Sequence, residues 1–336
     1  MLLEGSGTGP ILRRAARWGG LLVLNYHRIG DGRDSVYDRA LWSASVDELD
    51  EQLRFLRRNF TIVAPGARMF DEALRHGRAV AITFDDGYRD NYELAFPILR
   101  EHRISACFFL ATGYLDRPRL AWWDEIAWIV RTSKRDALPA CGWLPEPMTL
   151  RDGDREREVR ALLALHKALP VDRAQEFVDW LGTAAGTGRA DARLGDGAWM
   201  TWDMAREMQA GGMVFGAHTV DHPVLSQCSP ARQQAEIRGS LHRVRDELGA
   251  PVSLFSYPDG QQDSFDAVTR ACLRADEVDL AFSFYGGRQR DALDPLDVRR
   301  IGVSHETGRA LFRARATLPR LFAREIGLTG DVPTRP

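Results

Sequence analysis

Residues 79–87 read Ala-Val-Ala-Ile-Thr-Phe-Asp-Asp-Gly, an apolar run that ends in two adjacent carboxylates and a glycine. The run 79–84 predicts a buried β-strand, which places Asp85 and Asp86 at its C-terminal end. Gly87 permits a tight turn out of the strand. Neighbouring carboxylates repel each other unless a cation or a proton relieves the repulsion. This strand end is therefore a candidate site, although Asp residues in a polar loop also cap helices.

Outward from this strand, short apolar runs alternate with helix-like stretches. Repeated β–α units with short connections indicate a parallel sheet, and their number favours a closed or nearly closed barrel. In such barrels reacting groups gather at the C-terminal ends of the strands. The expected strands are 21–26, 61–64, 79–84, 105–111, 213–217, 252–257, 279–284 and 297–303, and the expected helices include 46–59, 89–102, 203–210, 230–248 and 263–274.

A second cluster of polar residues follows the predicted strand 213–217. It reads His-Thr-Val-Asp-His-Pro over residues 218–223. His218 and His222 are four residues apart, so on one helical turn both rings would lie on the same side and face one metal ion. With Asp86 they would form a set of two histidines and one carboxylate. This set predicts one divalent ion, with Zn²⁺ favoured and Co²⁺, Ni²⁺ or Mn²⁺ also compatible.

Thr-Phe-Asp-Asp-Gly at 83–87 and the His-containing motif at 218–223 resemble the first two signature motifs of the polysaccharide deacetylase family, the NodB-like carbohydrate esterases. The resemblance covers roughly residues 20–115 and 198–305. It implies a distorted (β/α) barrel that hydrolyses an N-acetyl or similar acyl amide on a sugar, in exopolysaccharide or surface-glycan metabolism. It also implies that Asp85 is the general base and that Asp86, His218 and His222 hold the metal.

The third family motif matches Ser-Tyr-Pro-Asp-Gly at 256–260 only in part. Ser256 stands where the family usually has an arginine that steadies the base, and Asp259 stands where an aromatic residue is usual. We expect Arg300, in the last predicted strand, to replace that arginine. Tyr257 and the backbone N–H of Asp259 are the expected substrate and oxyanion contacts, because a backbone donor does not depend on the side chain. The family's fourth motif is not found.

The resemblance further implies a histidine at a strand end as the general acid. His27 ends the first apolar run, and His305 follows the last one. A barrel is cyclic, so an N-terminal strand can lie beside the last strand. We therefore predict that His27 is the acid, with His305 as the alternative, because the residues after His305 read as the start of a helix.

Residues 112–200 break the alternation. We interpret them as a helical insertion within a single deacetylase domain that spans residues 1–336. The charged run 151–160 is interpreted as the solvated face of a helix. Four tryptophans flank or lie within the insertion, and we expect them to pack rather than to contact sugar; they are Trp122, Trp123, Trp199 and Trp202.

Composition limits which binding partners and which cellular compartment are expected. The net charge of −2 gives no field that would recruit nucleic acid. The four cysteines are far apart in the sequence, no run reaches the length of a membrane span, and no export signal is recognised, so a cytoplasmic protein is expected. The expected partner is an N-acetylated sugar or oligosaccharide.

Three other functions are alternatives to this interpretation. A serine hydrolase is disfavoured because no Gly-x-Ser-x-Gly motif is present. A deacylase of a lipid-linked sugar, a nucleotide sugar or a small non-sugar amide remains open. So does a glycan-binding protein without catalytic activity, because the third and fourth motifs are degraded.

Overall fold

The protein is described by a computed structural model that covers residues 20–319, apart from residues 67, 77, 151–152, 154 and 287–293. Parallel strands close into a barrel, because the first strand also pairs with β5. Around the barrel the order is β1 (Leu21–Tyr26), β12 (Val298–Gly302), β11 (Leu280–Ser283), β10 (Leu254–Ser256), β9 (Val214–Ala217), β6 (Cys107–Leu110) and β5 (Ala79–Phe84). The short β4 (Thr61–Ile62) pairs with β5 outside this ring. The predicted distorted (β/α) barrel is confirmed.

The strands that carry the first motif and the first histidine are neighbours in register. All six residues of β1 and of β5 are buried, and their register runs from Leu21 opposite Ala79 to Tyr26 opposite Phe84. The residues that follow, His27 and Asp85, therefore leave the barrel at the same height. On its other side β1 pairs with β12, so the N-terminal strand does lie beside the last one.

Side chains alternate between the inside of the barrel and the layer of helices outside it, as strand geometry requires. Leu21, Val23, Ala79 and Ala81 belong to a cluster with the alternate residues of other barrel strands, whereas Leu22, Leu24, Val80 and Ile82 pack with residues of the helices. The outer helices are α3 (Val46–Asn59), α4 (Met69–His76), α5 (Phe96–His102), α10 (Trp202–Ala210), α11 (Pro230–Leu248), α12 (Ala267–Ala275) and α13 (Gly308–Thr317).

Local sequence accounts for where these helices begin. Ser45 accepts the N–H of Glu48 and the Glu48 carboxylate accepts the N–H of Ser45, a capping box that starts α3. The helix predicted over 89–102 is present: it begins at Arg89, passes through a π-helical turn, Asn91–Ala95, and continues as α5. The described residues also include the short strands β2 (Arg28–Ile29) and β3 (Trp42–Ala44), and four 3-10 turns at Arg39–Leu41, Ala192–Gly195, Leu225–Gln227 and His305–Thr307.

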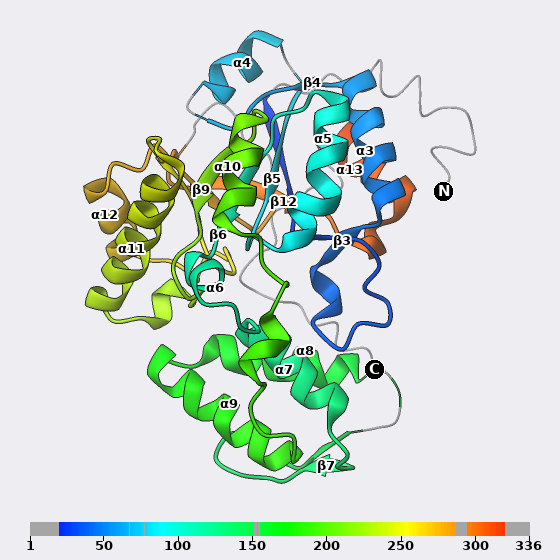
Figure 1. Ribbon diagram of the computed structural model, residues 1–336, viewed down its shortest axis with the longest axis vertical. Coiled ribbons are helices and arrows are strands. Elements are labelled where there is room, and N and C mark those ends of the chain that lie inside the picture. The colour runs from blue at the N-terminus through cyan, green and yellow to red at the C-terminus, as the bar shows by residue number, and fades with distance from the viewer. Residues whose placement is uncertain are drawn as a thin grey trace.

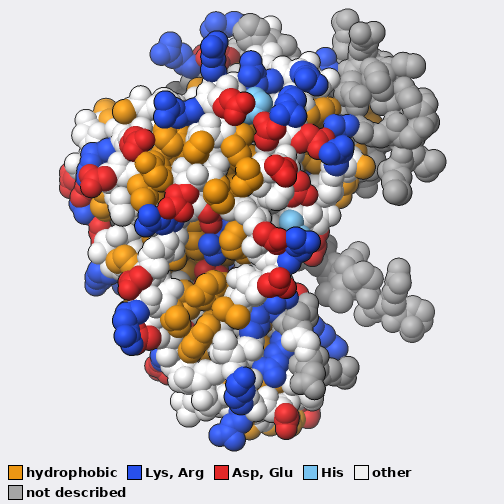
Figure 2. Space-filling model, turned by 45° about the vertical axis from the view of Figure 1, so that its right-hand side comes forward, with side chains coloured by type: hydrophobic (Ala, Val, Ile, Leu, Met, Phe, Trp, Pro, Cys, Tyr) orange, Lys and Arg blue, Asp and Glu red, His pale blue; other side chains and the backbone are white. Residues whose placement is uncertain are grey.

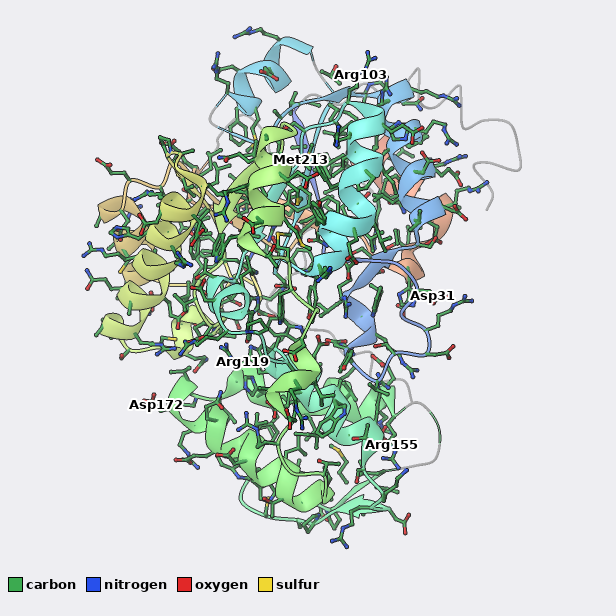
Figure 3. The ribbon with its side chains drawn as sticks, viewed as in Figure 1. Asp31, Arg103, Arg119, Arg155, Asp172 and Met213 are labelled. Atoms are coloured by element: carbon green, nitrogen blue, oxygen red, sulfur yellow. The ribbon has the colours of Figure 1, made fainter. Side chains whose placement is uncertain are left out.

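Residues 122–185 form a helical lobe, and its hydrophobic core also takes in Tyr88, Ala111, Tyr114 and Trp199 from the adjoining segments. Its helices are α7 (Trp122–Thr132), α8 (Glu156–Ala168) and α9 (Val171–Ala185), with a hairpin of β7 (Ala137–Leu138) and β8 (Met148–Thr149). The core is built from residues such as Ile126, Val130, Leu162 and Phe177, all fully buried. Figure 1 shows the lobe below the barrel, joined to it by α6 (Thr112–Asp116). Arg103 and Met213 precede β6 and β9, and in Figure 3 both lie at the end of the barrel away from the lobe. The C-terminal ends of these strands therefore face the lobe.

Among the described residues, no helix combines the length and the apolar character needed to cross a lipid bilayer. The first 19 residues, over which the sequence predicts no export signal, lie outside the described part of the chain.

Candidate metal centre and active site

The alternation of side chains along β5 decides where the two aspartates point. Ala79 and Ala81 face the barrel interior, so Thr83 and Asp85 follow them inward. Asp86 then adopts a left-handed backbone conformation, with φ 76°, and Gly87 continues it with φ 89°. This turn separates the directions of the two carboxylates, which allows each of them a different set of partners.

Asp85 is held in the barrel by Arg300. The guanidinium donates from Nη1 to Asp85 Oδ1 and from Nη2 to Asp85 Oδ2, both at 2.7 Å, and its side chain is fully buried. Asn25 Nδ2 donates to Asp85 Oδ2 at 3.1 Å. Ser256 accepts from Arg300 at 2.8 Å and lies 3.3 Å from Asp85 Oδ2. Arg300 thus reaches the base from β12, and the serine fits beside it.

This environment sets the charge of Asp85. Burial acts to raise the pKa of the carboxyl, but the adjacent Arg300 guanidinium outweighs burial and holds the pKa below its usual range. Asp85 is therefore an ionised carboxylate at neutral pH.

Asp86, His218 and His222 converge on one point. His218 Nε2 and His222 Nε2 each lie 3.5 Å from Asp86 Oδ1 and 3.0 Å from each other. Ligand atoms at the corners of a tetrahedral zinc site are about 3.3 Å apart, given bond lengths of about 2.0–2.1 Å. All three side chains are buried. The spacing matches what three ligands of one small cation require.

The hydrogen bonding of these groups also fits a cation. Asp86 Oδ1 is buried and has no hydrogen-bond partner. His218 Nδ1 lies 2.8 Å from the carbonyl oxygen of Ser256, so Nδ1 carries the proton and Nε2 is directed at the other two side chains. Burial, followed by the charge of His218, lowers the pKa of His222 to about 3, so its imidazole is neutral. Burial opposes protonation of His218, but the Asp85 and Asp86 carboxylates outweigh burial and raise the pKa of His218, so a bound cation would displace a proton there. The residues present therefore fit a divalent ion.

The loop between the two histidines differs from the sequence-based expectation. Residues 218–222 do not form a helical turn; Thr219 and His222 are both left-handed, with φ 64° and 54°. Thr219 Oγ1 accepts the N–H of His222 at 3.0 Å and donates to the His218 carbonyl at 2.5 Å. The Glu236 carboxylate accepts the N–H groups of Val220 and Asp221. These bonds fix a strained loop that brings both rings to one side.

The helical lobe supports His222 directly. The Trp123 ring packs edge-on against the His222 ring with 4.4 Å between centroids, and Trp122 Nε1 donates to the His222 carbonyl at 3.1 Å. Trp123 Nε1 in turn donates to the Tyr88 hydroxyl, which donates to Asp124. The burial of Trp122 and Trp123 is consistent with the prediction that they pack. The residue against which they pack is His222, a candidate metal ligand.

A cavity of about 470 Å³ opens over this centre, and Figure 2 shows the surface hollowed where the barrel meets the lobe. His27 lies in its wall with its ring edge-on to Phe284, at 5.6 Å between centroids. His305 lies elsewhere: it lines a smaller cavity beside α13, and its Nδ1 is 3.2 Å from the Trp42 carbonyl. The structure therefore brings His27, and not His305, to the candidate site.

The remaining predicted residues take different places. Tyr257 lines the cavity, but its hydroxyl donates to the Leu296 carbonyl at 2.7 Å. Asp259 also lines the cavity, with a left-handed backbone, φ 60°, and its carboxylate bonds Lys167 and Ser264. Burial opposes this ionisation, but Lys167 outweighs it and lowers the pKa of Asp259. Arg300 does not line the cavity; it contacts Asp85 from behind.

Sequence reasoning missed a wall of this cavity. Arg160, Leu163, Ala164 and Lys167 of α8 all line it, at the i, i+3, i+4, i+7 spacing of one helical face. Arg160 ends the charged run that we interpreted as a solvated face. The spacing was present in the sequence, but nothing there indicates which face of a helix in an insertion meets the barrel.

Comparison with known proteins agrees with the motifs. The family model described as polysaccharide deacetylase matches residues 74–135 and 174–278. A poly-β-1,6-N-acetyl-D-glucosamine N-deacetylase of Escherichia coli (strain K12) is 31% identical over 104 residues, which are 30% of this chain and 15% of the relative. The match thus spans about one seventh of the length of the curated relatives.

Solved structures with the same fold include IcaB from Ammonifex degensii, with a TM-score of 0.57 and 21% identity over 90% of this chain and 98% of that one. The Streptococcus pyogenes deacetylase PplD in complex with acetate has a TM-score of 0.57 and 18% identity over 87% of this chain and 96% of that one. At these identities the likeness shows the fold.

Proposed function

Because the chain belongs to the polysaccharide deacetylase family, we propose that it hydrolyses the N-acetyl group of a sugar and that one divalent metal ion takes part. The observation that carries this proposal is the convergence of Asp86, His218 and His222 beside an ionised Asp85 at the floor of one cavity. Zn²⁺ is the first metal to test, followed by Co²⁺, Ni²⁺ and Mn²⁺.

Asp86, His218 and His222 would hold the ion, which would polarise the acyl carbonyl and acidify a water molecule. Asp85 would accept the proton of the attacking water on its carboxylate, and Arg300 would keep that carboxylate ionised and oriented. The low pKa of Asp85 means that it is always available as a base, although it attracts a proton only weakly. The backbone N–H of Asp259 would donate to the developing oxyanion.

His27 would donate a proton to the nitrogen of the leaving amine. Its place in the cavity wall supports this role, as does the register that sets it level with Asp85 on the neighbouring strand. The separation of His305 from the cavity supports choosing His27.

The helical lobe belongs to the same functional unit in this proposal. Trp122 and Trp123 contact His222, and α8 contributes side chains to the cavity, so the lobe and barrel would form one deacetylase domain. The four described cysteines are free thiols, which supports a reducing compartment such as the cytoplasm.

An acetate-release screen tests the proposed function. The purified protein, loaded with Zn²⁺, would be assayed on N-acetylglucosamine, a nucleotide-linked N-acetyl sugar and β-1,6-linked N-acetylglucosamine oligomers, the last chosen from the name of the Escherichia coli relative. We expect acetate from at least one of them and none from Asp85→Asn with its metal still bound. Oligosaccharide binding without acetate release from any substrate would favour a glycan-binding protein instead.

A further inference from the structure

One face of helix α8 forms a wall of the cavity, through Arg160, Leu163, Ala164 and Lys167. The first and last of them are separated by about 10 Å along the helix axis, at 1.5 Å per residue. Since the strands end toward the lobe, this face meets the C-terminal edge of the barrel, where the candidate metal centre lies (Figure 1).

Both ends of this face form ion pairs with loops outside the lobe. Arg160 pairs with Asp38, which lies in the loop between β2 and β3. Lys167 forms an ion pair with Asp259, which follows β10, at 2.5 Å. The two carboxylates are only 6% and 15% exposed, so each cationic side chain reaches down to the rim of the barrel.

The packing of α8 holds it in this position. Val159 and Leu162 are fully buried in the core of the lobe, against α7 and α9. Helix α7 is fixed to the barrel by buried hydrogen bonds, among them those from the Asp38 N–H and the Tyr88 hydroxyl to the Asp124 carboxylate. Ion pairs with partly exposed side chains contribute little to stability by themselves. The helix stays in place through the lobe core, and the ion pairs close the gaps at its two ends.

The cavity is therefore walled by Trp122 and Trp123 on the His222 side and by the face of α8 between the two ion pairs. Its volume of about 470 Å³ is in the lower half of the 300–1,000 Å³ range of small-molecule sites, roughly enough for one or two sugar rings. For an interior residue of a long glycan to reach the metal centre, the chain would have to leave the cavity in two directions, and an ion pair stands at each end of the α8 wall. A chain terminus or a short sugar needs to leave in only one direction.

We propose that this enzyme takes a terminal or free N-acetyl sugar, such as the end of an oligosaccharide or a short activated sugar, and not the interior residues of a polymer. The proposal rests on the proposed deacetylase function and narrows its substrate class. Within it, Lys167 is a specificity-determining residue, because its side chain spans the gap between α8 and the loop after β10.

The test uses β-1,6-linked N-acetylglucosamine oligomers of one to six residues, with mass spectrometry locating each deacetylated residue. For the wild-type enzyme we expect kcat/KM to stop rising beyond the dimer, and acetate to leave a terminal residue. Lys167→Ala should increase the ratio of interior to terminal deacetylation in the hexamer at least five-fold. Lys134→Ala is the matched control, because Lys134 is the chain's only other lysine and an exposed residue that does not line the cavity.

Two outcomes would overturn the inference. If the wild-type enzyme deacetylates interior residues of the hexamer as fast as terminal ones, the substrate class is wrong while the deacetylase function stands. If the Lys167 and Lys134 variants give the same ratio as the wild type, α8 does not set the specificity. Absence of acetate from every oligomer would instead remove the proposed function, and this inference with it.

Discussion

At the scale of single residues, the buried pair of Asp85 and Arg300 is the most consequential contact. A buried ion pair gains little net stability, but removing one partner strands the other charge away from water. Arg300 is fully buried, and it also donates to Asn25 and to the Ser283 carbonyl. The arginine therefore organises the floor of the cavity as well as the charge of Asp85.

We expect Arg300→Met to lower the free energy of unfolding by about 3–5 kcal/mol, because Asp85 would be left as an unpaired buried charge. The variant should lose most deacetylase activity. Urea unfolding at pH 7 measures the stability change. The double variant Asp85→Asn, Arg300→Met should regain much of the stability and none of the activity. Equal stability of Arg300→Met and the wild type would show that the pair does not act as described.

Much of this residue-level arrangement could be predicted from the sequence. The two motifs identify Asp85, Asp86, His218 and His222, and the gap left by Ser256 pointed to Arg300. The geometry between His218 and His222 could not be predicted, because the left-handed conformations of Thr219 and His222 depend on tertiary contacts with Glu236 and the lobe. Asn25 was missed because a buried asparagine in an apolar strand carries no motif.

At the scale of elements, the helical lobe acts on the candidate metal centre through α7. The Trp123 ring packs against His222, and its indole N–H is anchored by Tyr88. Outer-shell partners orient a metal ligand, and loss of a hydrogen-bonded partner typically lowers metal affinity 10- to 100-fold. Trp123 is an outer-shell partner that acts by packing. The sequence alone assigned no role to the insertion, and the structure shows that its Trp123 side chain contacts the candidate metal ligand His222.

Trp123→Leu should weaken Zn²⁺ binding by about 10-fold or more while the protein remains folded, because His222 would lose the ring that limits its orientation. Calorimetric titration of the metal-free protein with Zn²⁺ measures the affinity. Trp128→Leu is the control, since Trp128 is on the same helix and packs against the lobe core. An equal loss of affinity in both variants would indicate a general loosening of the lobe, not support of His222.

The buried His166 side chain makes the stability of the lobe depend on pH. His166 stacks on Trp122 with 4.1 Å between centroids, and neither ring nitrogen has a hydrogen-bond partner. Burial, followed by the nearby charge of Lys167, lowers the pKa of His166 to about 4. The folded state thus disfavours the protonated ring, whereas the unfolded state accepts the proton freely. The folded state therefore has its full stability above pH 6.5 and loses part of it as the pH falls toward 4.

The loss should amount to about 3 kcal/mol between pH 6.5 and pH 4, at about 1.4 kcal/mol per pKa unit. His166→Phe keeps the stacking and removes the titrating group. Its loss of unfolding free energy between pH 6.5 and pH 4 should therefore be smaller than that of the wild type by about the same 3 kcal/mol. Chemical denaturation of both proteins at several pH values provides the comparison. Parallel pH profiles for the variant and the wild type would contradict the assignment.

At the scale of the whole molecule, the closed barrel is what allows an N-terminal histidine to join residues from the middle of the chain. β1 pairs with both β12 and β5, and the register places His27 level with Asp85. The alternation of strands and helices was enough to predict the barrel, because each element is amphipathic or apolar at its own period. The position of the lobe was not predictable, because the amphipathic pattern of a helix shows that one face is buried but not which element covers it.

If one divalent ion, held by Asp86, His218 and His222, drives the proposed deacetylation, bound metal and activity should be lost and regained together. The protein would be stripped of metal with a chelator and titrated with Zn²⁺, while bound zinc and acetate release are followed in parallel. Both should rise together and saturate at one ion per chain, and His222→Ala, though folded, should gain neither. Full acetate release by the metal-free protein, or by His222→Ala, would show that this ion is not required.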